Sequence, residues 1–339
     1  MTTRRDVLKA AGALAGGAAL AMPLVRRAAA ADEPLSFMTP FGYIPDFLEM
    51  MNMVSGGYLA KQGFAPKLIG GHGTATALQQ LVAGSVSFVR MTGIDEFNAV
   101  AKQKAPLVSV STLYQGSNFY FISAKDKPVK TAAEMKGKTI GVVSVGGSTE
   151  ALLDLALRSA GLTKKDVKIE VVGNSPGAFQ YIRQGRVDCF INSLAVVVAL
   201  QRANAAMEAW PTDRAAPMPA QIYVTSQALI DKKPDVVVRF LKALKGSTDD
   251  MLHGDLAAIF QRASKDFEIP GIKKLDELID LTKFTMANPW MAAGKENFLR
   301  NVPKLWNDAD KEIRSAGIAA VPNVDALYTN KYIDEALKA

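Results

Sequence analysis

The stretch MKGKTIGVVSVGGSTEALLDLALRSAGL, residues 135–162, decides the fold class. Residues 139–143 form a short apolar run that predicts a buried strand, and two glycines predict a turn after it. Ser148 and Thr149 then open an amphipathic segment that ends at Gly161, which predicts a helix. The stretch is a strand–turn–helix unit. Its loop either caps the helix or holds a polar ligand group on the free backbone N–H groups.

Similar units recur along the chain. Apolar runs that predict strands, most of them followed by loops of small polar residues, lie at residues 35–38, 67–69, 86–89, 107–113, 119–123, 167–172, 187–191 and 221–225. From residue 234 onward the pattern predicts helices. Strands that alternate with helices predict a mainly parallel α/β sheet, which binds its ligands at the carboxyl ends of the strands.

Length and charge limit the possible classes of protein. With 339 residues the chain predicts two domains. The formal net charge is +7, but residues 1–31 carry +4 of it, which leaves +3 for the rest. So small an excess gives no reason to expect a nucleic acid as a partner.

The first 31 residues have the pattern of an export signal. Arg4 and Arg5 precede an apolar stretch at residues 10–25, and small residues follow at 28–31. This pattern predicts a cleaved signal of the twin-arginine type. No cysteine follows the apolar stretch, so we expect a soluble periplasmic protein without a lipid anchor.

Cysteine and histidine are too scarce for most metal or disulfide chemistry. The single cysteine, Cys189, lies in an apolar run and cannot form an intramolecular disulfide. The two histidines, His72 and His253, have no cysteine nearby for a zinc site. We therefore expect neither a metal nor a cofactor.

Candidate ligand contacts lie in the loops after the strands. Phe41 and Tyr43 project from a loop with two prolines, where they either pack locally or line a pocket. Arg90 emerges from an apolar strand, so it needs either an internal carboxylate or a ligand anion as its partner. The Gly-rich loop at residues 70–76 lacks the third glycine of a dinucleotide fingerprint.

Several linked segments resemble the solute-binding proteins of ABC importers, in the group that binds alkanesulfonates, taurine, nitrate and thiamine precursors. These segments are KPVKTAAEMKGKTIG at residues 127–141, SAGLTKKD at 159–166, QGRVD at 184–188, and a helix preceded by proline within 230–244. The resemblance covers nearly all of the chain after residue 31. The chain departs from the family pattern at Glu134-Met135, where Asp-Leu is usual, and at Cys189-Phe190.

The resemblance implies the type II periplasmic binding protein fold, an α/β fold of two lobes joined by crossing strands at residues 119–125 and 221–226. Lobe I would comprise residues 32–123 and 221–339, and lobe II residues 124–220. A solute would be trapped between the lobes by hinge closure. The partners would be a small-molecule solute and an ABC permease in the cytoplasmic membrane, and the protein would be a monomer.

The expected pocket combines hydroxyl, amide and aromatic side chains of both lobes. Lobe I would contribute Thr39, Phe41, Tyr43, His72, Thr74, Arg90, Thr92, Tyr114 and Ser117, and lobe II Ser148, Thr149, Asn174, Asn192 and Ser193. Hydroxyls and helix N-termini would hold an anionic head, with Arg90 as a possible ion-pair partner, and the aromatic rings would cover an apolar body. We therefore expect a small organic anion, a sulfonate or carboxylate with or without an aromatic body. A neutral heterocycle like a thiamine precursor is the alternative.

Two other classes compete with a transport receptor. Eukaryotic relatives of this fold make a thiamine-precursor pyrimidine, and His72 would be the candidate residue of such an enzyme. The predicted export signal and the lack of a recognisable nucleophile–base spacing argue against catalysis, so we expect no enzyme. A sensor or adaptor subunit that binds a solute but feeds no permease would have the same sequence features.

Overall fold

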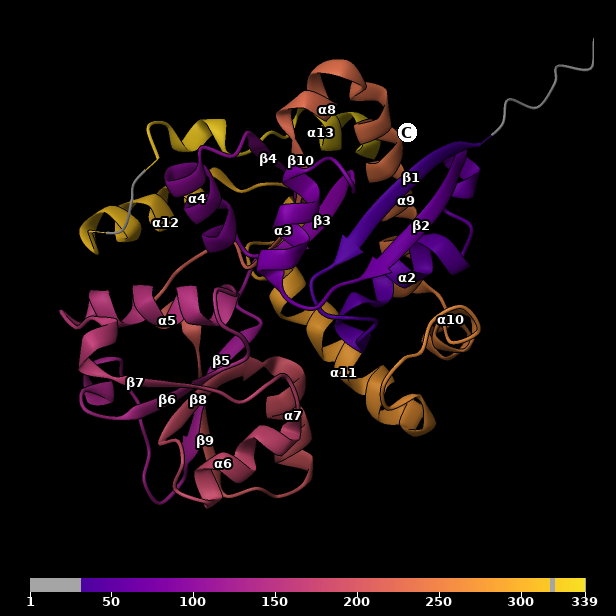
Figure 1. Ribbon diagram of the computed structural model, residues 1–339. Helices are drawn as coiled ribbons and strands as arrows, with labels where there is room; N and C mark the ends of the chain where they lie inside the picture. Colours follow the sequence, from indigo (N-terminus) through magenta and orange to yellow (C-terminus); the bar gives the residue numbers. More distant parts are fainter. Residues whose placement is uncertain (1–31, 318–320, 339) are drawn as a thin grey trace, which may run out of the picture. The chain divides into compact units, whose positions relative to one another are not determined.

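Two five-stranded sheets organise the chain (Figure 1). The computed structural model describes residues 32–317 and 321–338, and the export signal predicted in residues 1–31 lies outside this part. In spatial order the first sheet contains β2 (Phe64–Gly70), β1 (Glu33–Thr39), β3 (Phe88–Met91), β10 (Gln221–Ser226) and β4 (Leu107–Tyr114). The second contains β7 (Lys168–Val171), β6 (Thr139–Val142), β8 (Cys189–Ser193), β5 (Phe119–Ala124) and β9 (Met207–Pro211).

Both sheets have the same pattern of strand directions. In the first sheet β1 runs parallel to β2 and β3, whereas β10 is antiparallel to its neighbours β3 and β4. In the second sheet β6 runs parallel to β7 and β8, whereas β5 is antiparallel to β8 and β9. Each sheet is therefore mainly parallel with one antiparallel strand, which confirms the predicted two-sheet α/β fold.

The antiparallel strands are those that follow a crossing between the sheets. The chain leaves the first sheet after β4 and enters the second with β5, and it returns from β9 to the first sheet with β10. These two strands correspond to the crossing strands expected from the sequence. The lobe boundary placed after residue 123 stays a prediction, and β5 itself pairs within the second sheet.

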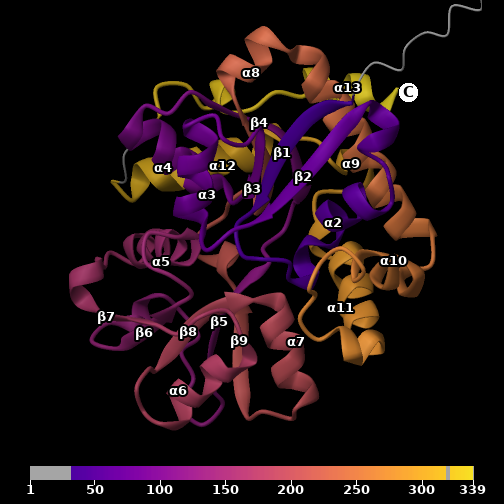
Figure 2. The ribbon, with the colours of Figure 1, turned by 45° about the vertical axis from the view of Figure 1, so that its right-hand side comes forward.

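Helices cover both faces of each sheet (Figure 1, Figure 2). The first sheet and the C-terminal part carry α2 (Leu48–Ser55), α3 (Thr74–Val82), α4 (Gly93–Gln103), α8 (Gln227–Lys232), α9 (Pro234–His253), α10 (Leu256–Ala263), α11 (Leu275–Ala287), α12 (Pro303–Ser315) and α13 (Lys331–Leu337). The second sheet carries α5 (Ser148–Ser159), α6 (Phe179–Arg183) and α7 (Leu194–Arg202). No helix in the described part of the chain is long and apolar enough to cross a membrane.

The strands separate the apolar core into layers because alternate side chains point to opposite faces. In β10, Tyr223 faces the core under α9, whereas Ile222 and Val224 face the core under α4 and α12. The core under α4 also contains Leu153 and Leu155 of α5, which belongs to the second sheet. Apolar packing therefore joins the two sheets along α5.

The stretch that decided the fold class forms the predicted unit. β6 is followed by a turn in which Gly146 adopts φ +68°, and α5 begins at Ser148. The Thr149 hydroxyl accepts a hydrogen bond from the backbone N–H of Val143 at 3.0 Å, which ties the turn to the end of the strand. Gly161, with φ +74°, follows the helix where the sequence predicted its end.

One strand escaped prediction. β9, with the sequence MEAWP, lies at the edge of the second sheet and runs into the proline-rich segment at residues 211–219. It is short and contains Glu208 and Pro211, residue types that are tolerated only because an edge strand is paired on one side. Such a strand gives little apolar periodicity to recognise.

Glu96 on α4 provides a test of stability against pH. Its side chain is fully buried, and within the described residues neither carboxylate oxygen has a hydrogen-bond partner. Burial raises the pKa of Glu96 well above its usual value. As the pH rises above the pKa that Glu96 has in the unfolded chain, Glu96 ionises in the unfolded state first. The free energy of unfolding therefore falls until the pH passes the pKa that Glu96 has in the folded state.

Replacing Glu96 by methionine should therefore raise the free energy of unfolding near pH 8 by about 1–3 kcal/mol. The gain should shrink near pH 4, where Glu96 is mostly protonated in both the folded and the unfolded state. Urea unfolding at the two pH values measures it, with Glu268→Met at an exposed position as the control. A gain that is the same at both pH values would show that the carboxylate is not the source.

Candidate functional site

A small cavity is walled by both sheets. Its volume is about 30 Å³, which leaves room for about one water molecule. The first sheet and its loops contribute Pro40, Phe41, Ile44, Asp46, Phe47, Thr74, Met91 and Gln221. The second sheet and the crossing before it contribute Asn118, Phe119, Val143, Ser148, Asn174 and Ser193. As it stands, the cavity is too small for a solute much larger than a water molecule.

Strand ends place these side chains around the cavity. Phe41 follows β1, Thr74 opens the helix after β2, and Met91 is the last residue of β3. On the other side Asn174 follows β7, and Ser193 is the last residue of β8. Because parallel strands direct their carboxyl ends to the same edge, each sheet presents a cluster of loop residues there.

Five residues predicted for the pocket line this cavity together: Phe41, Thr74, Ser148, Asn174 and Ser193. They come from both of the expected lobes. The other nine predicted residues do not line it, and most of them have structural partners.

Hydrogen bonds across the cavity rim join the two sheets. The hydroxyl oxygens of Thr74 on α3 and Ser148 on α5 lie 3.1 Å apart. Ser148 also donates to the Asp95 carboxylate on α4 at 2.6 Å, and the Thr92 backbone N–H and hydroxyl donate to the same oxygen. Burial raises the pKa of Asp95, although these donors favour its charged form. The N-terminus of α5 is thus held against the first sheet.

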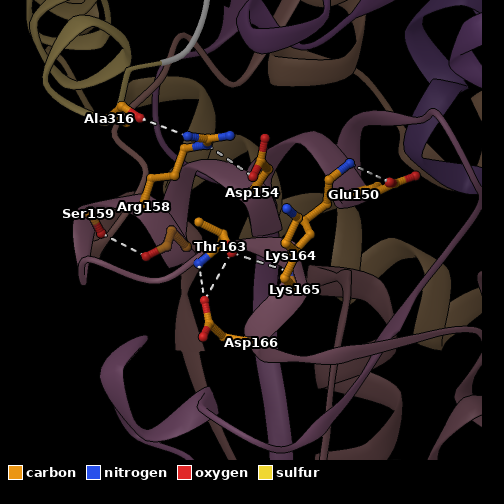
Figure 3. A network of polar contacts seen from close by, with 10 residues as sticks. Glu150, Asp154, Arg158, Ser159, Thr163, Lys164, Lys165, Asp166 and Ala316 are labelled. Atoms are coloured by element: carbon orange, nitrogen blue, oxygen red, sulfur yellow. Dashed lines mark hydrogen bonds and ion pairs between the residues drawn. The ribbon is translucent and has the colours of Figure 1, made fainter.

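The C-terminal part of α5 makes a second contact of this kind (Figure 3). The Arg158 guanidinium donates to the Asp154 carboxylate at 3.1 Å and to the carbonyl of Ala316, which follows α12, at 3.2 Å. Nearby, Glu150 accepts hydrogen bonds from the Gly146 backbone at 2.7 Å and from Lys164 at 2.9 Å. Helix α5 is therefore tied to the first sheet's helices near both of its ends.

Arg90 has an internal carboxylate as its partner, one of the two alternatives left open by the sequence. Its guanidinium is fully buried and lies 2.5 Å from the Glu49 carboxylate. It also donates to the backbone carbonyl of Asp46 at 2.5 Å and to the Gln221 side-chain oxygen at 3.2 Å. The rings of Phe47 and Tyr114 lie within 4.8 Å of it. Arg90 does not line the cavity and is not available there as an anion-binding group.

The remaining predicted residues of the first sheet hold loops or pack. The Thr39 hydroxyl donates to the carbonyl of Gly42 at 2.5 Å, and Tyr43 donates to the carbonyl of Leu68 at 3.3 Å. His72 is exposed. Thr92 forms a capping box at the start of α4, and Tyr114 is buried against Arg90.

Three predicted residues near the crossing or in the second sheet have similar roles. The Ser117 hydroxyl lies 2.7 Å from that of Thr212, which links the two crossings between the sheets. Thr149 holds the turn after β6. The Asn192 amide donates to the carbonyl of Gly173 at 2.9 Å and so positions the loop that carries Asn174.

Sequence analysis missed three polar residues of the cavity: Asp46, Asn118 and Gln221. Asp46 follows Pro45 in a short turn, and the aromatic residues on either side of it are the stronger sequence signal. Gln221 begins β10, which is antiparallel, so its amino end lies beside the carboxyl ends of its neighbours. Its amide donates to Asn118 at 3.2 Å, which joins the two crossings at the cavity. A polar residue opening an apolar strand is the signal that could have identified Gln221.

Acidic, cysteine and histidine residues are the candidates for a metal site. Within residues 32–317 and 321–338, no group of three or more such side chains is placed to hold a metal ion. Cys189 is fully buried, and burial raises the pKa of its thiol to about 12.

Known proteins similar to this chain are named for, or solved with, different bound molecules. The chain is 22% identical over 252 residues to the riboflavin-binding protein RibY of Chloroflexus aurantiacus, covering 73% of this chain and 70% of RibY. A second similar protein is the ligand-binding component of an ABC-type import system from Staphylococcus aureus, solved with zinc bound. It superimposes with a TM-score of 0.63 at 13% sequence identity, and the match covers 91% of this chain and 100% of the Staphylococcus aureus chain. A third is the alkanesulfonate-binding protein SsuA from Xanthomonas axonopodis pv. citri, bound to MOPS. Its TM-score is 0.61 at 15% sequence identity, and the match covers 89% of this chain and 97% of the SsuA chain.

These similarities agree with the resemblance found in the sequence segments. At 13–15% identity the solved structures establish the fold and leave the solute open. The family described as NMT1/THI5 like matches residues 45–255, which is more than half of the chain. The chain therefore belongs to the NMT1/THI5-like family and has the fold of the periplasmic solute-binding proteins of ABC importers.

Proposed function

We propose that this protein is the solute-binding component of an ABC-type importer and that it captures a small planar heterocycle between its two sheets. The observation that carries the proposal is the cavity itself, which is walled by strand-end loops of both sheets and closed by hydrogen bonds across its rim. Hinge closure around a ligand is a recognised use of this architecture. The export expected from residues 1–31 would place the protein in the periplasm, beside a membrane permease.

The lining of the cavity favours a planar solute. Rings of Phe41, Phe47 and Phe119 provide apolar surface that can cover a flat body. Around them lie the amides of Asn118 and Asn174, and within the described residues no partner takes the side-chain N–H groups of these two asparagines. Amides of this kind can pair with the nitrogen and oxygen atoms of a heterocyclic ring.

The similarity to a riboflavin-binding protein agrees with a ring-shaped solute. The thiamine-precursor-like heterocycle considered from the sequence belongs to the same class. We propose binding without turnover, as expected for a chain with the fold of solute-binding components of import systems.

A small organic anion is the second candidate. It is favoured by Ser148, which lines the cavity at the N-terminus of α5, where the helix dipole is positive. The similarity to an alkanesulfonate-binding protein is compatible with it. The position of Arg90 weakens it, because Glu49 already neutralises that charge.

A thermal-shift panel separates the two candidates. Riboflavin, substituted pyrimidines and pyridines form one arm, and alkanesulfonates and aromatic carboxylates form the other. A ligand at a hundredfold excess over its Kd stabilises the protein by about 2.7 kcal/mol, which is a shift of several degrees. We expect the shift in the heterocycle arm.

A cavity-filling variant locates the binding site. Ser193→Phe places a ring where the solute would lie and should abolish the thermal shift. Ser85→Phe, at an exposed position after α3, is the matched control and should leave the shift intact. A full shift in Ser193→Phe would place the binding site elsewhere.

A further inference from the structure

The lining of the cavity carries one acidic side chain. Of the cavity-lining residues in the described part of the chain, Asp46 alone carries an ionisable side chain. It lies on a 3₁₀ turn, Pro45–Phe47, between the first strand and α2. Asp46 also lines a second cavity, of about 10 Å³, together with Glu49 and Tyr114.

The carboxylate of Asp46 lacks a neutralising partner among the residues that the structure describes. Within the described residues, no hydrogen bond or ion pair joins it to another group, and the contact from Arg90 goes to its backbone carbonyl. Arg90, which contacts the Asp46 backbone, is paired with Glu49, so these three side chains together have a net charge of −1. Burial raises the pKa of Asp46 to about 6, which leaves it ionised at neutral pH. The side chain of Asp46 is partly buried and lines the cavity, so its unpaired carboxylate favours a ligand that brings a donor or a positive charge.

From this arrangement we infer that Asp46 selects the solute by charge: the site takes a planar ring with a protonated nitrogen or an amino group and rejects anions of the same size. The inference rests on the proposed function, since it assigns a solute class to the same cavity. The amino group or ring N–H would donate to the Asp46 carboxylate, while the phenylalanine rings cover the ring faces. A sulfonate or carboxylate would instead approach an uncompensated negative charge.

Three ring compounds of similar size test the assignment: 4-aminopyridine as a planar cation, aniline as a neutral analogue and benzoate as an anion. Isothermal titration near pH 8 should rank the wild-type affinities in that order. Asp46→Asn should weaken 4-aminopyridine roughly 10- to 100-fold, the effect of losing a hydrogen bond to a charged group, and should weaken aniline less. Asp126→Asn, at an exposed position, should change none of the three affinities.

The ranking on the wild-type protein needs no variant, so a poorly folded Asp46→Asn protein cannot obscure it. Tighter binding of benzoate than of 4-aminopyridine would overturn the charge assignment and leave the cavity as a solute site. An unchanged affinity for 4-aminopyridine in folded Asp46→Asn would also overturn it. Failure of all three compounds to bind, with a thermal shift from a larger solute that Ser193→Phe abolishes, would reject the charge assignment alone. Failure of every ligand in both assays would reject the proposed function as well.

Discussion

Replacing Arg90 by methionine is expected to lower the free energy of unfolding by about 3–5 kcal/mol, because it leaves a buried carboxylate without its cation. Arg90 and Glu49 are 0% and 1% exposed, and their charged atoms lie 2.5 Å apart. After the substitution, the Tyr223 hydroxyl at 2.8 Å would be the remaining donor to Glu49. Urea unfolding monitored by circular dichroism measures the loss.

Two further variants make this prediction specific. Replacing both Arg90 and Glu49 by methionine removes both charges and should recover most of the lost stability, since apolar replacements of a buried pair are often neutral. Lys304→Met breaks an exposed ion pair with Asp308 and should cost at most about 1 kcal/mol. A loss below about 1 kcal/mol in Arg90→Met would contradict the account of this ion pair.

The same variants address the question that the sequence left open about Arg90. If the guanidinium served an anionic solute, the double variant would lose binding even when folded. Because Arg90 lies outside the cavity lining, we expect the folded double variant still to bind its solute. Loss of the Arg90 contacts to the Asp46 carbonyl and to Gln221 should lower the affinity less than Ser193→Phe does.

The fold could be predicted because its signals are local and repeated. Each strand-and-turn unit, such as the one from β6 to α5, carries its own apolar run, glycine turn and amphipathic helix. β9 escaped because an edge strand with glutamate and proline has almost no such signal.

The site was predictable only where a side chain sits at the carboxyl end of a strand. That rule identified Thr74, Ser148 and Ser193, all of which line the cavity. It could not separate them from Thr149 or Asn192, because a hydroxyl or amide at a strand end can hold the loop as readily as a ligand.

The partner of a buried charge depends on contacts between distant parts of the chain. Arg90 and Glu49 are 41 residues apart, so nothing local in the sequence shows that they meet. Asp46 was overlooked for a related reason. A single acidic residue in a loop is usually solvated, and only its position in the folded chain makes it part of a cavity.

If the protein works as proposed, a solute should reach the cavity only when the two sheets separate. The hydroxyl oxygens of Thr74 and Ser148 lie 3.1 Å apart across the rim, so cysteines at both positions should be close enough to form a disulfide. Cys189 should not interfere, because it is fully buried and burial raises the pKa of its thiol to about 12. Oxidation of the double variant would lock the sheets together.

Solute uptake by the Thr74→Cys/Ser148→Cys protein, freed of solute before oxidation, is the most direct measurement. The probe is the compound that gives the largest thermal shift with the wild-type chain, and the Ser148→Cys single variant is the control. We expect the oxidised double variant to take up none of it, whereas reduction should restore uptake. If the oxidised protein binds the compound as fast and as tightly as the reduced protein, the solute does not enter between the two sheets and the account is wrong.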